Sequence, residues 1–274
     1  MMLGPKASVE AVEAVRERLG LNQPLAQQYL DYAGNLLRGD LGESIRYQVP
    51  VSELIRQFLP VTGFLALYVV FLTIPATLVM GILAARNRGS WIDQSIRLIS
   101  VLGMTMPVFW LAILMLRLFS VDLGLFPVSG FGSGFTGHLH HLFLPAVSIS
   151  IWLIPVLVRN LRAALLEQMG ADYVVASRAK GLPEDYIFRR HILKNASLPT
   201  LNLFGVLVTY LIGGTVIVEL VYAVPGLGTL MFNAILGRDY SVIQGLTLFY
   251  AFATVLITLG TDLLSSMIDP RVKS

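Results

Sequence analysis

The sequence predicts an all-α protein that crosses a membrane several times. Its 274 residues are 55% hydrophobic and only 14% charged, and the mean hydropathy is +0.71. A soluble domain averages roughly 25% charged residues. Five uncharged runs also approach or exceed the roughly 20 residues with which a helix crosses the hydrocarbon core. These runs are continuous rather than alternating, which favours helices over the strands of a membrane barrel.

The five runs divide the chain into membrane segments and loops. They comprise residues 57–85, 98–116, 142–158, 195–218 and 240–261. A sixth uncharged run, 220–237, contains Pro225, Gly226 and Gly228, and this Pro-Gly-x-Gly pattern is typical of turns. We therefore interpret residues 220–237 as a re-entrant or interfacial segment rather than a sixth span.

Loop charges predict the orientation. Twelve Lys and Arg residues lie in the loop after the first run, the loop after the third run and the tail, whereas the opposite side carries only Arg117 and Arg238. Positively charged loops stay on the cytoplasmic side of a membrane. The prediction is therefore a transmembrane domain over 57–266, which includes a cytoplasmic loop at 159–198, and a cytoplasmic tail at 267–274.

The N-terminal stretch 1–56 has a different character. It carries six Lys and Arg residues and seven Asp and Glu residues, and the spacing of its apolar residues is typical of an amphipathic helix. The orientation above requires it to lie outside, yet it lacks the apolar core of a signal peptide. Two interpretations stay open: a span that precedes it is missing from this chain, or the stretch is cytoplasmic and the simple topology fails.

The loop between the third and fourth runs predicts two short helices. Asp172 is expected to cap the first, and Gly181 to end it in the way glycine ends many helices. Pro183 suits the first turn of the second helix. The small side chains of Ala176 and Ala179 would let another protein approach closely. On the residues alone, a solvated basic loop explains the segment equally well.

Motifs in this loop resemble a known family. Val175-Ala176-Ser177, followed three residues later by Gly181, resembles the Glu-Ala-Ala-x-x-x-Gly coupling motif of permeases in binding-protein-dependent ATP-binding-cassette (ABC) importers. The wider phrase from Asp172 to Leu182, and the later Pro-Gly-Leu-Gly and Asp-Pro-Arg motifs, are similar to the dipeptide, oligopeptide and nickel branch. This sequence departs from the motif at Val175 and Ser177, where the family has Glu and Ala.

The resemblance implies a type I ABC importer permease fold, which normally has six spans, so the first would be missing here. It implies a multi-pass protein of the inner membrane, without cofactors, that works with a second homologous permease, two cytoplasmic ATPases and an external binding protein. It assigns ATPase coupling to Asp172, Tyr173, Ala176, Ser177, Arg178, Ala179, Lys180 and Gly181. It assigns a periplasmic turn or gate to Glu219, Pro225, Gly226 and Gly228.

Other classes of function fit less well. No Lys follows a Gly, so a P-loop is absent and the chain is not expected to hydrolyse ATP. Residues 132–137 have glycine spacing like that of a dinucleotide loop, but no strand is predicted before them, and we interpret them as a flexible external loop. The net charge of +3 is too small to indicate a nucleic-acid partner.

The substrate stays open between peptides and nickel or a metal chelate. His138, His140 and His141 lie in one external loop and could contact a transition metal, but a polar interfacial loop is the favoured interpretation. A secondary transporter or channel is the alternative from an unrelated class. It would need inverted repeats or charges along a membrane path, and the sequence displays neither.

Overall fold

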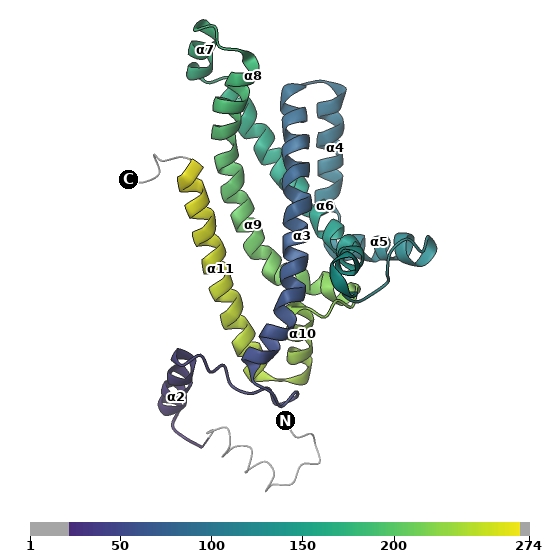
Figure 1. Ribbon diagram of the computed structural model, residues 1–274, viewed down its shortest axis with the longest axis vertical. Helices are drawn as coiled ribbons and strands as arrows, with labels where there is room; N and C mark the ends of the chain where they lie inside the picture. Colours follow the sequence, from purple (N-terminus) through teal and green to yellow (C-terminus); the bar gives the residue numbers. More distant parts are fainter. Residues whose placement is uncertain (1–21, 269–274) are drawn as a thin grey trace. The chain divides into compact units, whose positions relative to one another are not determined.

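The computed structural model describes residues 22–268, with the side chains of Ile212 and Ile268 left aside. Within this range the chain is helical, and the β-type pairing is limited to an isolated bridge between Glu43 and Pro50. The all-α prediction is thus confirmed for the described residues (Figure 1). The first 21 residues of the predicted external segment, and residues 269–274 of the predicted tail, lie outside them.

The chain divides into two compact units. Among the described residues, the first contains 22–57 together with Leu230–Leu248, and the second contains Phe58–Thr229 and 249–268. In the first unit, helix α2 spans Leu25–Leu37. The apolar spacing that predicts an amphipathic helix involves Val9, Val12, Val15 and Leu19, which lie outside the described residues. The buried carboxylate of Asp239 organises this unit, because it accepts hydrogen bonds from the Ser44 hydroxyl at 2.6 Å and the Arg46 amide at 3.2 Å.

Three uninterrupted helices are long and apolar enough to cross a membrane. They are α3 (Val51–Arg86), α6 (Gly134–Met169) and α11 (Tyr240–Ile268). Two bent pairs raise the number of candidate spans to five. One pair joins α4 (Trp91–Thr105) to α5 (Val108–Met115) and the π-helical turn η1 (Leu116–Asp122). The other comprises α8 (Glu184–Ile187), η2 (Phe188–Ile192) and α9 (Leu193–Val221).

The second predicted span is not one straight helix. Its two parts meet at an angle of 100°. Pro107 stands at the break as the N-cap of α5, and Met106 before it has an extended backbone with φ −82° and ψ 125°. A proline disfavours the helical conformation in the residue that precedes it, so the helix ends there. The prediction of a continuous helix over 98–116 is therefore wrong.

The sixth uncharged run forms a turn followed by α10 (Leu227–Gly237). This helix has 11 residues, which is too short to cross the hydrocarbon core. Its length agrees with the interpretation of a re-entrant or interfacial segment.

The core of the second unit is built around α6. In Figure 1, α6 runs obliquely and passes behind α3, and it packs against α9 and α4. Its buried side chains Leu142, Leu153 and Leu157 join residues of α3 and α9 in one apolar cluster. Further along α6, Leu161 and Leu165 belong to a second cluster. This second cluster includes Val174 and so supports the segment around Val175–Gly181.

Candidate functional site

Helix α7 (Asp172–Ala179) and the short α8 confirm the two helices predicted in the loop. Their caps differ from the prediction. Ala171 occupies the N-cap of α7, and Asp172 lies in the first turn, where its charge complements the helix dipole instead of capping an amide. Pro183 is likewise the N-cap of α8 rather than a first-turn residue.

Gly181 ends α7 as predicted. Its backbone has φ +74°, and its amide donates to the Arg178 carbonyl at 2.9 Å, while the Leu182 amide donates to the Ser177 carbonyl at 3.3 Å. Among the described residues, nothing lies within 4 Å of the place that a Cβ would occupy. Glycine is therefore favoured at this position by the left-handed backbone and not by crowding.

One face of α7 is anchored to the protein. Val174 is fully buried in the cluster formed by Leu161 and Leu165 of α6 with Ile187 and Ile192. Burial of a valine side chain is worth roughly 1.5–3 kcal/mol. The Tyr173 hydroxyl donates to the Gln168 side chain at 2.8 Å and accepts from the Asn195 amide at 3.3 Å. These contacts fix α7 to α6 and to the start of α9.

The opposite face of α7 is open. Val175 is 59% exposed, and Ala176, Ala179, Lys180 and Gly181 are exposed as well. The small side chains of Ala176 and Ala179 are thus exposed on this face. We call Val175, Ala176, Ala179, Lys180 and Gly181 the open face of α7.

Two of the predicted coupling residues have local structural partners. Ser177 is half-buried, and its hydroxyl donates to the Tyr173 carbonyl at 2.7 Å. Arg178 donates to both carboxylate oxygens of Glu184, at 2.7 and 3.2 Å, and so links α7 to α8. These hydrogen bonds raise the pKa of the Arg178 guanidinium above its ordinary value. Arg178 therefore remains charged while it holds the two helices together.

The predicted turn at 219–228 is organised by a buried carboxylate. Glu219 is fully buried, and its Oε1 accepts from the Thr62 hydroxyl of α3 at 2.8 Å. Its Oε2 accepts from the Thr229 amide at 2.9 Å, and Thr62 Oγ1 accepts from the Leu227 amide at 2.8 Å. Thr62 and Glu219 thus satisfy free amides in the first turn of α10, which would otherwise lack partners.

Two positions of this turn require glycine, because other atoms of the protein lie too close to leave room for a side chain. A Cβ on Gly226 would lie 2.5 Å from the Glu219 carboxylate. A Cβ on Gly228 would lie 2.7 Å from the Val216 Cα and 2.8 Å from Glu219 Oε2. Pro225 is exposed and stands apart from these contacts. The structure therefore brings together Glu219, Gly226 and Gly228, while the sequence contains no signal that would have found Thr62.

A buried ion pair also escaped the sequence analysis. Asp93, in the first turn of α4, is 1% exposed and contacts Arg162 of α6 at 2.6 Å. From the sequence, Arg162 is only one of the basic loop residues that predict the orientation of the chain in the membrane.

His138, His140 and His141 do not lie in a loop, as the sequence predicts, but in the first turns of α6. The three rings each approach a different backbone carbonyl: His138 that of Phe131, His140 that of Leu125 and His141 that of Gly137. Within residues 22–268, no three His, Asp or Glu side chains are grouped so that they could hold a metal ion. Helix α6 begins at Gly134, so the interpretation of 132–137 as a flexible external loop is wrong for residues 134–137.

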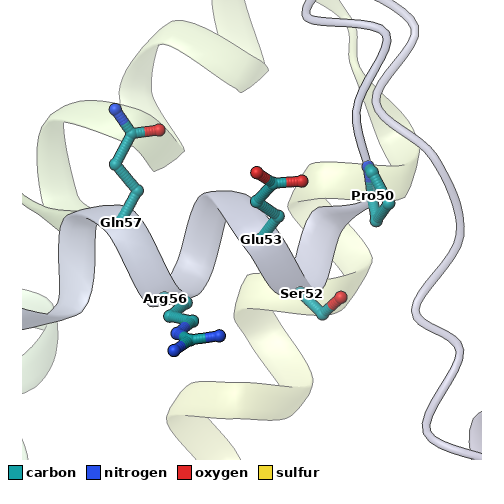
Figure 2. Close-up of a pocket in the computed structure, with 5 residues that line it drawn as sticks. All are labelled: Pro50, Ser52, Glu53, Arg56 and Gln57. Atoms are coloured by element: carbon teal, nitrogen blue, oxygen red, sulfur yellow. The ribbon is translucent and has the colours of Figure 1, made fainter.

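A pocket of about 900 Å³ lies at the start of α3. Figure 2 shows Glu53 and Gln57 projecting from one side of the helix, and Arg56 and Ser52 from the other. These four side chains are exposed. The pocket is therefore an open polar surface and not an enclosed site for chemistry.

Comparisons with known proteins agree on one family. Residues 77–274 match the family described as binding-protein-dependent transport system inner membrane component. A putative peptide transport system permease protein of Brucella abortus is 42% identical over 100% of this chain and 88% of its own length. The oligopeptide transport system permease protein AppB of Bacillus subtilis is 37% identical over 100% of this chain and 88% of its own.

A solved structure has the same fold at low sequence identity. It is an inward-facing conformation of the MetNI methionine ABC transporter, with a TM-score of 0.64 and 20% identity. The match covers 79% of this chain and 97% of the other.

Proposed function

The chain belongs to the family of inner-membrane components of binding-protein-dependent transport systems, and from this premise we propose that it imports peptides as one permease subunit of an ATP-driven transporter. Relatives that are 35–42% identical over nearly the whole chain are described as permeases for peptides, oligopeptides or dipeptides. The structural observation that carries the proposal is the open face of α7 on an anchored helix. A short helix that is fixed on one side and free on the other suits transmission of force from a partner.

The proposed assembly contains this chain, a second homologous permease, two cytoplasmic ATPases and an external binding protein. The ATPases hydrolyse ATP, and the open face of α7 sits in a groove on one of them. This arrangement requires the basic loops to be cytoplasmic, in line with their excess of Lys and Arg. Arg178, paired with Glu184, keeps the docking helix in a fixed position relative to α8.

Alternating access follows from the packing of α7. When the ATPases bind ATP and close, they displace α7, and Val174 passes the displacement to Leu161 and Leu165 of α6. Because α6 packs against α9 and α4, these helices tilt together. The cavity shared with the second permease then switches the side to which it opens. ATP binding and substrate release are thereby coupled in free energy, and the coupling acts in both directions.

The turn around Glu219 is proposed to serve as the outer gate. Glu219 and Thr62 hold the first turn of α10 between α9 and α3. A tilt of α9 therefore moves the start of α10 as well. A short helix attached in this way can open or close the outer end of the path.

Calorimetry with the cognate binding protein tests the substrate. We expect alanyl peptides of two to five residues to bind, and nickel chelates not to bind. Binding of nickel chelates without binding of any peptide would contradict the peptide assignment. The descriptions of the relatives favour peptides, and the separate carbonyl partners of the three histidines give no support to nickel.

A further inference from the structure

Asp93 and Arg162 form a forked ion pair inside the second unit. The carboxylate of Asp93 is held by Arg162 Nε at 2.6 Å and Nη2 at 2.7 Å. It also accepts from the Gly89 amide at 3.0 Å, and the Asp93 amide donates to the Ser90 hydroxyl at 3.4 Å. The Asp93 side chain is 1% exposed and that of Arg162 is 18% exposed. The start of α4 is thus tied to α6 by two parallel charged hydrogen bonds.

Such a pair is better suited to fixing the relative position of two helices than to stabilising the fold. The free energy lost when two charges leave water is about as large as the free energy gained from their attraction. A buried ion pair is therefore weak evidence for stabilisation of the fold. The planar guanidinium, by contrast, donates two parallel hydrogen bonds to a carboxylate, and this fork restricts their relative orientation. The pair therefore sets the distance and angle between α4 and α6 more strictly than apolar contacts do, because the hydrophobic effect has no direction.

The position of the pair connects α4 with the coupling helix. Arg162 follows Leu161, which packs with Val174 of α7 in the same cluster. At its other end, α4 meets α6 again: a Cβ on Gly103 would lie 3.0 Å from the Ile151 carbonyl oxygen. Helix α4 is therefore held to α6 near both ends, and the chain bends by 100° directly after it.

We propose that Asp93 and Arg162 are positioning residues that make α4 move together with α6. A displacement of α7 then passes through α6 to α4 and on to the bend at Pro107, beyond which lie α5 and η1. Without the fork, α4 keeps its apolar contacts with α6 through Ile96 and Val158 but slides on them. This inference rests on the proposed function, since it assigns the pair a place in the coupling of ATP hydrolysis to import.

The test uses the complete transporter in proteoliposomes with its binding protein. The variants are Asp93→Asn, Arg162→Lys, which keeps the charge but removes the fork, and the exchanged pair Asp93→Arg with Arg162→Asp. The control is Arg117→Lys, because Arg117 and Asp122 form an exposed pair with 3.8 Å between charged atoms. The primary measurement is the number of ATP molecules hydrolysed for each radiolabelled alanyl peptide imported.

We expect Asp93→Asn and Arg162→Lys to assemble and hydrolyse ATP, with about fivefold or more ATP consumed per peptide, the lower end of typical coupling between sites. The exchanged pair should recover part of the coupling, and Arg117→Lys should match the parent. A merely structural role would reduce the amount of assembled transporter and leave the ratio unchanged. An unchanged ratio in both single variants would overturn the proposal. So would loss of assembly in all three pair variants, because it would assign the pair to folding.

A second measurement does not depend on the substrate. Val121 of η1 is 62% exposed, and the chain has no cysteine, so Val121→Cys reports on the segment beyond the bend. We expect its labelling by a thiol reagent to change on ATP binding in the parent and to stay constant in Arg162→Lys. If the parent fails to import alanyl peptides but retains this difference, the peptide assignment fails and the inference stands. If labelling in the parent does not respond to ATP, the inference fails.

Discussion

Replacing Gly181 by valine tests whether the end of α7 sets ATPase docking. Gly181 has φ +74° and, among the described residues, no atom within 4 Å of its Cβ position, so the entire cost of a side chain is backbone strain. For residues other than glycine, the left-handed conformation costs roughly 1–2 kcal/mol. That energy corresponds to a factor of about 5–30 in the population of the native turn.

The matched control is Gly181→Asn. Asparagine adds a side chain of similar size but tolerates the left-handed conformation. Both variants lie outside the candidate spans, so we expect equal amounts of permease in the membrane. In nanodiscs, binding of the purified ATPase to Gly181→Val should weaken by up to about 5–30-fold, because apparent affinity scales with the fraction of competent conformer.

The asparagine variant should bind the ATPase like the parent. Equal affinities for valine and asparagine, both weak or both unchanged, would refute the reasoning. The first result would mean that bulk at this position matters, and the second would mean that the turn does not take part in docking.

Three further predictions concern other parts of the chain. Ala179→Glu should leave the permease folded, since Ala179 is exposed, but should abolish ATPase co-purification, because a desolvated unpaired charge costs several kcal/mol. Gly226→Ala should lower the free energy of unfolding by about 1–3 kcal/mol, measured in detergent by chemical denaturation, because its Cβ meets the Glu219 carboxylate at 2.5 Å. In intact cells, Ser177→Cys should resist an impermeant thiol reagent and become labelled only after permeabilisation.

Each of these has an outcome that would contradict it. ATPase co-purification at the level of the parent would remove Ala179 from the docking surface. Gly214→Ala is the control for Gly226→Ala, since nothing described lies within 4 Å of its Cβ position, and equal effects of the two would contradict the crowding argument. Labelling of Ser177→Cys from outside would reverse the orientation.

Several local features of this protein could be predicted from the sequence, although the helix cap at Ala171 and the break at Pro107 were not. The length of an apolar run and the absence of charges decide whether a segment suits the hydrocarbon core, and both are properties of neighbouring residues. The end of α7 at Gly181 is equally local, because a single glycine in the left-handed conformation terminates a helix. The exposed alanines of the loop followed from the same short stretch.

Tertiary structure alone decided which distant residues meet. Thr62 and Glu219 are 157 positions apart, and Asp93 and Arg162 are 69 apart. The residues next to each partner in the sequence do not indicate which distant residue it contacts. The effect of a proline also depends on tertiary structure, since Pro60 lies within a continuous helix whereas Pro107 stands at a break between two helices. Helix packing decides the path of the chain after a proline and the partner of a buried charge. The reason is that packing determines which polar groups find hydrogen-bond partners once water is excluded.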